Sequence, residues 1–184
     1  DAGKSALLEA LAGSRAARGK VRLGGRDLVG LGPEARLRLG LAQVRQRPDH
    51  FSGHSVAAHL ALGFLPARSR LALAQARAFR VAPELSGRGD AVVDGLSRAD
   101  GRLLDVARAL MSSPSVLLLD EPSLDLDAGR VAQLVEALRE EGLAVLLAER
   151  YAAPALDIAD FACLMLGGRV IAEGTPDELR RDER

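Results

Sequence analysis

The 184-residue chain has one cysteine, Cys163, no tryptophan, one tyrosine and four phenylalanines. A single cysteine excludes an intrachain disulfide and favours a reducing compartment. Because Cys163 lies in the apolar run 161–166, we expect a small buried hydrophobic side chain there rather than a reactive thiol. With so few aromatic residues, the core of a chain that is 48% apolar has to be built from leucine, valine and alanine.

The chain also lacks a charge excess and a long apolar run. Its 25 lysines and arginines balance 25 acidic residues, whereas nucleic-acid-binding domains usually carry a clustered basic excess, so we expect no nucleic-acid partner. No uninterrupted apolar run approaches the ~20 residues that cross a bilayer, and no signal peptide is visible. We expect a soluble, cytoplasmic chain, which can still dock on a membrane protein.

Apolar periodicity predicts an α/β fold in a chain long enough for one domain with a substantial core. Helical spacing predicts helices at 5–11, 55–62, 69–79, 102–111 and 130–141. Short apolar runs predict strands at 20–23, 26–28, 39–44, 116–119, 143–148, 161–166 and 169–172, with a loop at 83–94. Buried strands joined by a helical crossover indicate a parallel sheet covered on both faces.

The chain opens with a candidate phosphate-binding loop. Gly3-Lys4-Ser5 precedes the predicted helix 5–11, so backbone amides and Lys4 would face phosphate oxygens while Ser5 binds Mg²⁺. Such a tripeptide also arises by chance in a turn, and it gains weight only from other features. A loop of this kind follows a buried strand, so we expect an upstream segment that contains one.

Two adjacent carboxylates end the apolar strand 116–119. Asp120 would hold Mg²⁺, directly or through water, and Glu121 would orient or deprotonate an attacking water. The alternative is a solvated corner between strand and turn, which four preceding apolar residues disfavour. A nucleoside-triphosphate site needs both cations around phosphates and an acid for the metal, so the two segments together predict a P-loop ATPase.

Residues 106–111 and 117–124 strongly resemble the nucleotide-binding subunit of an ABC transporter, and the similarity covers essentially the whole chain. The resemblance implies an ABC-type P-loop ATPase fold, mainly a parallel sheet flanked by helices, with a small antiparallel β part and a helical subdomain. It implies a single domain, 1–184, whose P-loop helix, antiparallel part and Q-loop lie in 1–50, helical subdomain in 51–95 and remaining motifs in 96–184. The cofactors implied are ATP and Mg²⁺.

The same resemblance assigns the site residues. The Walker A loop would be Asp1, Ala2, Gly3, Lys4, Ser5 and Ala6, and Walker B would end at Asp120 before the catalytic Glu121. Gln46 matches the Q-loop glutamine, which binds Mg²⁺ and links it to the transmembrane partner. Ser97 matches the signature serine, and Ser123 and Asp127 match D-loop positions that cross a dimer interface. Segments 54–60, 83–85, 155–160 and 168–176 are similar to branched-chain amino acid importer ATPases.

The sequence departs from the family pattern at several motifs. The signature, normally Leu-Ser-Gly-Gly-Gln, reads Leu-Ser-Arg-Ala-Asp at 96–100, and Asp100 would place a negative charge near phosphate unless it is neutralised. The register 85–90 looks more signature-like, but it breaks the spacing to the following helix and strand. Asp1 stands where glycine is usual, and Ala6 stands where a second hydroxyl is usual.

Arg150 occupies the position of the family's switch histidine. As a fixed cation it can bind a γ-phosphate but cannot shuttle a proton, and the alternative is an ordinary surface arginine at a strand end. His50, His54 and His59 fit no common metal-ligand spacing, so we expect a partly exposed helix entry rather than a metal site. The charged run 180–184 is expected to be a solvated tail.

We therefore expect the ATP-hydrolysing subunit of a transporter, peripheral on the inner face of the cell membrane, with transmembrane permease subunits as partners. The altered signature favours a heterodimer with a second ABC ATPase. The alternative is a catalytically impaired regulatory or structural subunit, which Arg150 and the signature also fit. A DNA-repair or translation ATPase is disfavoured, because the coiled-coil insertions or second cassette typical of those chains are missing from the sequence.

Overall fold

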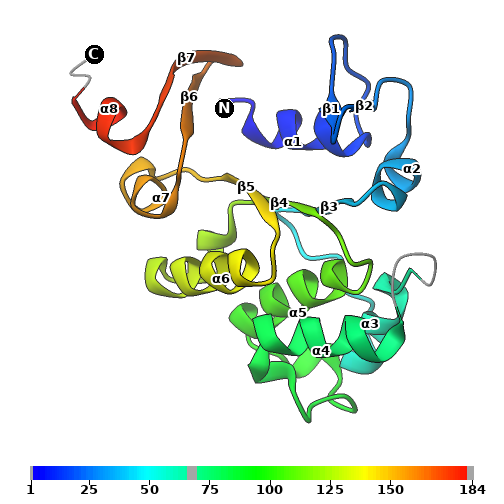
Figure 1. Cartoon of the computed structure of the whole chain (residues 1–184). Coiled ribbons are helices and arrows are strands. Elements are labelled where there is room, and N and C mark those ends of the chain that lie inside the picture. The colour runs from blue at the N-terminus through cyan, green and yellow to red at the C-terminus, as the bar shows by residue number, and fades with distance from the viewer. Residues whose placement is uncertain (1, 66–69, 182–184) are drawn as a thin grey trace.

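The computed structural model describes residues 2–65 and 70–181, arranged around a small central sheet (Figure 1). Its α-helices are α1 (Lys4–Ala12), α2 (Pro33–Arg38), α3 (Val56–Gly63), α4 (Leu71–Val81), α5 (Arg98–Leu110), α6 (Ala128–Glu140), α7 (Ala152–Ile158) and α8 (Pro176–Arg181). Its strands are β1 (Arg22–Leu23), β2 (Arg26–Asp27), β3 (Leu41–Val44), β4 (Val116–Asp120), β5 (Ala144–Ala148), β6 (Ala162–Leu166) and β7 (Arg169–Gly174). Three single-turn 3₁₀ helices are η1 (Pro83–Leu85), η2 (Val93–Gly95) and η3 (Pro122–Leu124).

The central sheet is parallel, in the order β3-β4-β5, and helices cover both of its faces. Side chains alternate along β4: Leu117 and Leu119 enter the larger core beneath α5 and α6, whereas Leu118 enters the smaller core beneath α1. Figure 1 shows α1 on one side of the sheet and α5 and α6 on the other. The predicted parallel sheet with helices on both faces is confirmed.

Two antiparallel hairpins lie outside this sheet. One pairs β1 with β2, and the other pairs β6 with β7. The turn of the second hairpin returns to the start of the chain, where the Gly168 N–H donates to the Ala2 carbonyl at 3.2 Å. The fold therefore places a C-terminal turn directly against the loop that opens the chain.

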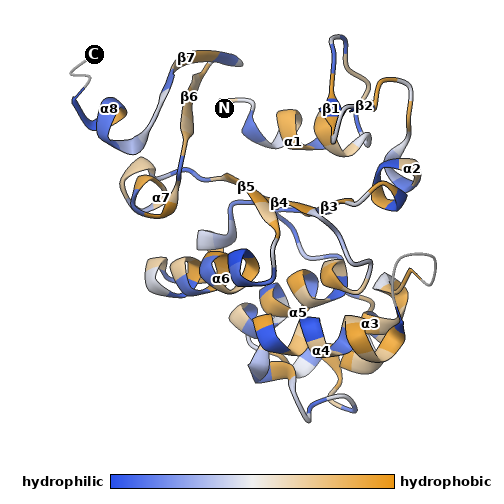
Figure 2. Cartoon of the chain, viewed as in Figure 1, coloured by the Kyte–Doolittle hydropathy of each residue, from blue (hydrophilic) through white to orange (hydrophobic). Residues whose placement is uncertain are grey.

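Helices α3, α4 and α5 form a helical part on the far side of the sheet from α1 (Figure 1). Val56 and Leu60 of α3 and Ala74 and Ala78 of α4 are buried in the same core as most of α5. Apolar residues make up most of α3 and much of α4 (Figure 2), although His59 of α3 and Arg102 and Asp105 of α5 are also buried. Small alanines on α4 let the helices approach closely, and the burial of their apolar faces holds the helical part together.

A buried arginine joins α1 to α2. Arg36 is 6% exposed, and its guanidinium donates to four backbone carbonyls, those of Ala10, Leu11, Leu28 and Leu31. Two of these carbonyls belong to the last turn of α1, where a helix leaves acceptors without intrahelical donors. Arg36 thereby fixes the C-terminal end of α1. The N-terminal end of the same helix lies at the candidate site.

Several expected elements differ from the structure. Helices α2, α7 and α8 were not predicted, because each is at most seven residues long and carries at most one buried residue, so no apolar stripe marks it. Helix α5 begins at Arg98 rather than at 102, and β3 begins at Leu41 rather than at 39. Segment 83–94 contains the short turns η1 and η2, and residue 69, the expected start of the second helix, lies outside the described residues.

The expected environment of Cys163 was wrong. Its side chain is exposed on β6, opposite Glu173 of β7, rather than buried. The apolar run around it belongs to a two-stranded ribbon, and Leu166 on the same strand is also exposed, at 67%. The run 180–184 was expected to be a solvated tail, but its first two residues belong to α8, which extends to Arg181. Residues 182–184 lie outside the described part.

Candidate nucleotide site

The loop before α1 has the backbone that a phosphate-binding loop requires. Gly3 has φ 83°, a left-handed conformation that favours glycine, and it serves as the N-cap of α1. A Cβ at Gly3 would also approach Gly168 Cα to 3.3 Å. Helix α1 begins at Lys4, so the free N–H groups of its first turn, including Ser5 and Ala6, provide a favourable environment for an anion.

Asp120 ends β4 on the side of the sheet that faces α1. It is 4% exposed, and within residues 2–65 and 70–181 its Oδ1 has no hydrogen-bond partner. Burial raises the pKa of Asp120, and a hydrogen bond with Ser5 opposes that rise. A buried carboxylate oxygen beside a serine hydroxyl is the kind of hard oxygen ligand that suits Mg²⁺.

Glu121 stands at the point where β3, β4 and α1 converge. Its Oε2 accepts a hydrogen bond from Gln46 Nε2 at 2.9 Å, and its Oε1 lies 3.8 Å from Lys4 Nζ. Its backbone has φ 45° and ψ 55°, a conformation that costs a non-glycine residue about 1–3 kcal/mol. The three side chains come from positions far apart in sequence, and strained backbone of this kind clusters at active sites.

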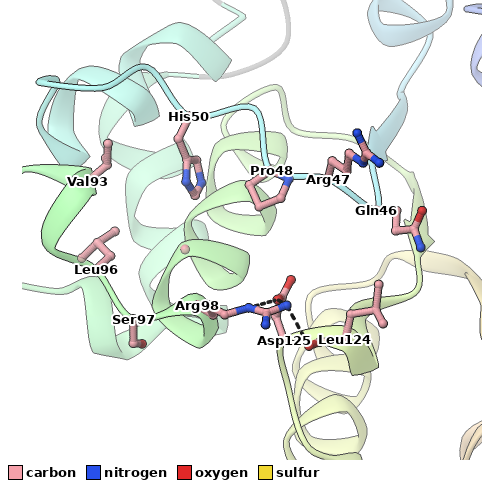
Figure 3. A pocket seen from close by; sticks show the side chains of 11 residues that line it. Gln46, Arg47, Pro48, His50, Val93, Leu96, Ser97, Arg98, Leu124 and Asp125 are labelled. Atoms are coloured by element: carbon pink, nitrogen blue, oxygen red, sulfur yellow. Dashed lines mark hydrogen bonds and ion pairs between the residues drawn. The ribbon is translucent and has the colours of Figure 1, made fainter.

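The signature-like loop leads into α5, and its residues Leu96, Ser97 and Arg98 line a cavity of about 420 Å³ (Figure 3). Ser97 caps the helix by accepting the Asp100 N–H at 3.0 Å, and Arg98 pairs with Asp125 at 2.8 Å. Asp100 is neutralised by Arg88, 3.0 Å away, which holds the pKa of that carboxyl below its usual range. The negative charge expected to oppose phosphate binding is therefore compensated within the chain.

The structure brings together only some of the predicted site residues. Lys4, Ser5, Gln46, Asp120 and Glu121 converge at one end of the sheet. Other neighbourhoods hold Ser97 at the start of α5, Ser123 and Arg150 beside Glu149, and Asp127 at the N-cap of α6. Ala2 lies in the loop before α1, where its carbonyl accepts the Gly168 N–H. Asp1 lies outside the described residues.

Arg102 is a residue that sequence reasoning missed. Its side chain is fully buried, and it donates to the backbone carbonyls of Arg45 and Gln46, each at 2.5 Å, and to Asp125 Oδ2 at 2.7 Å. It therefore ties α5 to the segment that carries Gln46 and to the loop after β4. The sequence signal that could have indicated its burial was its position beside the apolar face of an amphipathic helix.

The three histidines differ more than expected. His59 is fully buried rather than partly exposed; its Nε2 accepts the Phe51 N–H at 2.9 Å, and its Nδ1 donates to the Ser55 carbonyl at 3.0 Å. His50 places Nε2 3.2 Å from Asp105 Oδ1, and His54 is exposed. In the described part of the chain no cluster of histidine, cysteine and acidic residues is suited to a metal.

His50 predicts a pH dependence of stability. Asp105 raises its pKa above the ordinary 6.5 by hydrogen-bonding the protonated ring, while burial and the Arg108 cation oppose the shift. A raised folded-state pKa gives stabilisation that is complete below the unfolded pKa and is lost as pH rises through the folded value. The His50→Gln substitution should therefore lower the free energy of unfolding more at about pH 5.5 than at about pH 9.

Urea unfolding at both pH values checks this expectation. The matched control is His54→Gln, which changes an exposed histidine. A His50→Gln effect of equal size at the two pH values would contradict it.

Comparisons with known proteins decide the family. The ABC transporter family model matches residues 2–124, which is more than half of the chain. The chain belongs to the ABC transporter family. It is an ATP-binding and ATP-hydrolysing subunit of that family, as expected from its motifs, and the predicted fold class and enzyme class are confirmed.

Relatives of this ABC ATPase serve different transport systems. It is 36% identical to the high-affinity branched-chain amino acid transport ATP-binding protein BraG of Pseudomonas aeruginosa, over 95% of this chain and 77% of the relative. It is 30% identical to the lipopolysaccharide export system ATP-binding protein LptB of Haemophilus influenzae, over 90% of this chain and 71% of the relative. By their names, these relatives belong to an amino acid transport system and a lipopolysaccharide export system.

Solved structures carry the same fold. A crystal structure of a nucleotide-free ATP-binding cassette from an ABC transporter matches with a TM-score of 0.81 and 25% identity, covering 97% of this chain and 79% of that one. ABC ATPases generally dimerise and pair with transmembrane permease subunits. Among the described helices of this chain, none has the length and apolarity to cross a bilayer.

Proposed function

We propose that this ABC ATPase uses Mg-ATP to power import of branched-chain amino acids or related polar solutes, as one half of an ATPase heterodimer. The observation that carries the proposal is the convergence of Lys4, Gln46 and Glu121 beside buried Asp120, while the signature is altered at Arg98 and Asp100. The similarity to BraG favours the solute class. We propose that residues 1–184 act as one ATPase domain, cytoplasmic and peripheral on the inner face of the membrane.

The chain's own residues divide the chemistry between them. The amides from Gly3 to Ala6 and the Lys4 ammonium bind phosphate oxygens. Ser5, Asp120 and Gln46 would hold Mg²⁺, which would supply electrostatic stabilisation to the transferred phosphoryl group. Glu121 would orient the attacking water and accept its proton as a general base.

The altered signature supports asymmetry between two subunits. In an ABC dimer, the signature of one subunit completes the nucleotide site of the other. Here the loop presents an 80% exposed Arg98 where the family has a glycine, so backbone amides approach a phosphate less closely. Residues at the chain's own site keep the required chemistry, which favours a partner whose signature is intact. Ser123 and Asp127 would face that partner, and Arg150 would bind the γ-phosphate.

The test is to compare the isolated protein with the reconstituted pair. Purified alone, the full-length protein should bind Mg-ATP and hydrolyse it slowly, and a second ATPase subunit with an intact signature should raise turnover. A partner subunit altered in its own signature serine should fail to raise it, which is the control. Rapid hydrolysis by the isolated chain would contradict the heterodimer.

A second candidate function is a nucleotide-binding regulatory subunit without its own catalysis. The observation that favours it is Arg150, an exposed side chain that lies 5.9 Å from the Tyr151 ring centre and replaces the switch histidine. An arginine there can bind a phosphate but cannot relay a proton. The Glu121 variant described in the Discussion distinguishes the two functions.

A further inference from the structure

Glu149 holds the loop that follows β4. Its Oε1 accepts the Ser123 backbone N–H at 3.0 Å, and its Oε2 accepts the Ser123 hydroxyl at 2.5 Å. Glu149 comes directly after β5, and Ser123 lies in η3, so the pair joins two neighbouring strand ends that are 26 residues apart in sequence. Hydrogen bonds to a carboxylate are among the stronger ones in proteins, so this contact holds Ser123 close to the end of β5.

The anchored turn contains the strained residue of the site. Glu121 has a left-handed backbone, which a residue with a Cβ keeps only where its surroundings hold it. On one side, the Glu121 N–H donates to the Ala148 carbonyl at 2.9 Å. On the other side, two residues later, the Glu149 carboxylate holds Ser123. The turn 121–123 is therefore fixed to the end of β5 at both of its ends.

We propose that Glu149 is a positioning residue for ATP hydrolysis, acting through Ser123 to keep the Glu121 carboxylate aimed at Gln46 and Lys4. The proposal rests on the proposed hydrolysis at this site. Without Glu149, the turn would relax from its strained backbone, and the Gln46–Glu121 hydrogen bond would form for less of the time. ATP binding would persist, because the phosphates are bound by the loop before α1 and by Lys4.

The two oxygens of Glu149 also argue against a direct chemical role. Both accept hydrogen bonds from Ser123, and Oε2 accepts the Arg150 N–H as well, at 3.2 Å. A carboxylate whose two oxygens accept these hydrogen bonds holds the position of the loop and takes no part in proton transfer. A glutamine at 149 can reproduce both contacts with Ser123, since its amide oxygen accepts the Ser123 N–H and its amino group donates to the serine hydroxyl, but it cannot accept the Arg150 N–H.

The experiment compares Glu149→Ala with Glu149→Gln in the full-length protein purified with its partner subunits. We expect Glu149→Ala to lower kcat by about 10- to 100-fold, because a displacement of about 1 Å in a reacting group has an effect of that size. The KM for ATP and the melting temperature should stay close to those of the wild type. Glu149→Gln should restore most of the turnover, and Glu140→Ala, at an exposed position on α6, should leave it unchanged.

Four results would overturn the proposal. Unchanged turnover in Glu149→Ala, when the wild-type complex hydrolyses ATP, would refute the positioning role alone. A parallel loss of kcat, nucleotide affinity and melting temperature would show a purely structural role, and equal losses in the alanine and glutamine variants would show that charge matters rather than geometry. A wild-type complex without any turnover would refute the proposed function, and the positioning role with it.

Discussion

A Glu121→Gln variant should bind Mg-ATP normally and lose most of its hydrolysis. Glutamine keeps the shape of the side chain and can still contact Gln46 Nε2, but it cannot accept the proton of the attacking water. Removing a general base typically lowers turnover by about 10²–10⁴-fold. Lys4 and the loop before α1 are unchanged by the substitution, so the nucleotide should remain bound.

The measurement is steady-state hydrolysis together with retention of labelled ATP in the complex with the partner subunit. Glu140→Gln, an acidic residue exposed on α6, provides the matched control and should behave as the wild type. Turnover of the Glu121→Gln complex close to that of the wild type would contradict a catalytic Glu121. That result would favour the regulatory function, in which the partner subunit performs the hydrolysis.

Replacing Arg102 by methionine should strongly destabilise the protein. The buried guanidinium neutralises Asp125, whose side chain is only 6% exposed, and it satisfies two backbone carbonyls. The substitution leaves Asp125 with only the exposed Arg98 as a partner and removes the donor to two carbonyls, and breaking a buried ion pair costs about 3–5 kcal/mol. We expect the free energy of unfolding of Arg102→Met to fall by that amount in urea titrations.

Arg98→Met is the matched control, since Arg98 pairs with the same Asp125 from an 80% exposed position. Exposed pairs contribute about 0–1 kcal/mol, so this variant should lose little stability. Adding Asp125→Asn to Arg102→Met should recover part of the loss, because the buried charge is then absent. Equal losses in Arg98→Met and Arg102→Met would show that burial does not set the strength of these pairs.

Long periodic elements and contiguous motifs were accessible from the sequence. The helices α1, α5 and α6 carry apolar residues at helical spacing, and the strands β4 and β5 are continuous apolar runs. The short helices α2, α7 and α8 carry no such pattern, and Cys163 in its apolar run was misplaced because a strand's burial depends on what packs against it. A sequence pattern records what a residue can bury, and the fold decides whether a neighbour covers it.

The sequence by itself indicated the family and predicted the chemistry of a nucleotide site, because the phosphate loop and the acidic strand end are each encoded by contiguous residues. Only the tertiary structure showed that Arg88 neutralises Asp100, that Arg102 joins Gln46 to Asp125, and that Glu149 holds Ser123. Charged side chains can reach many partners, and the sequence does not rank them. Which partner each one meets depends on how the strand ends and α5 are brought together, and only the folded chain settles that.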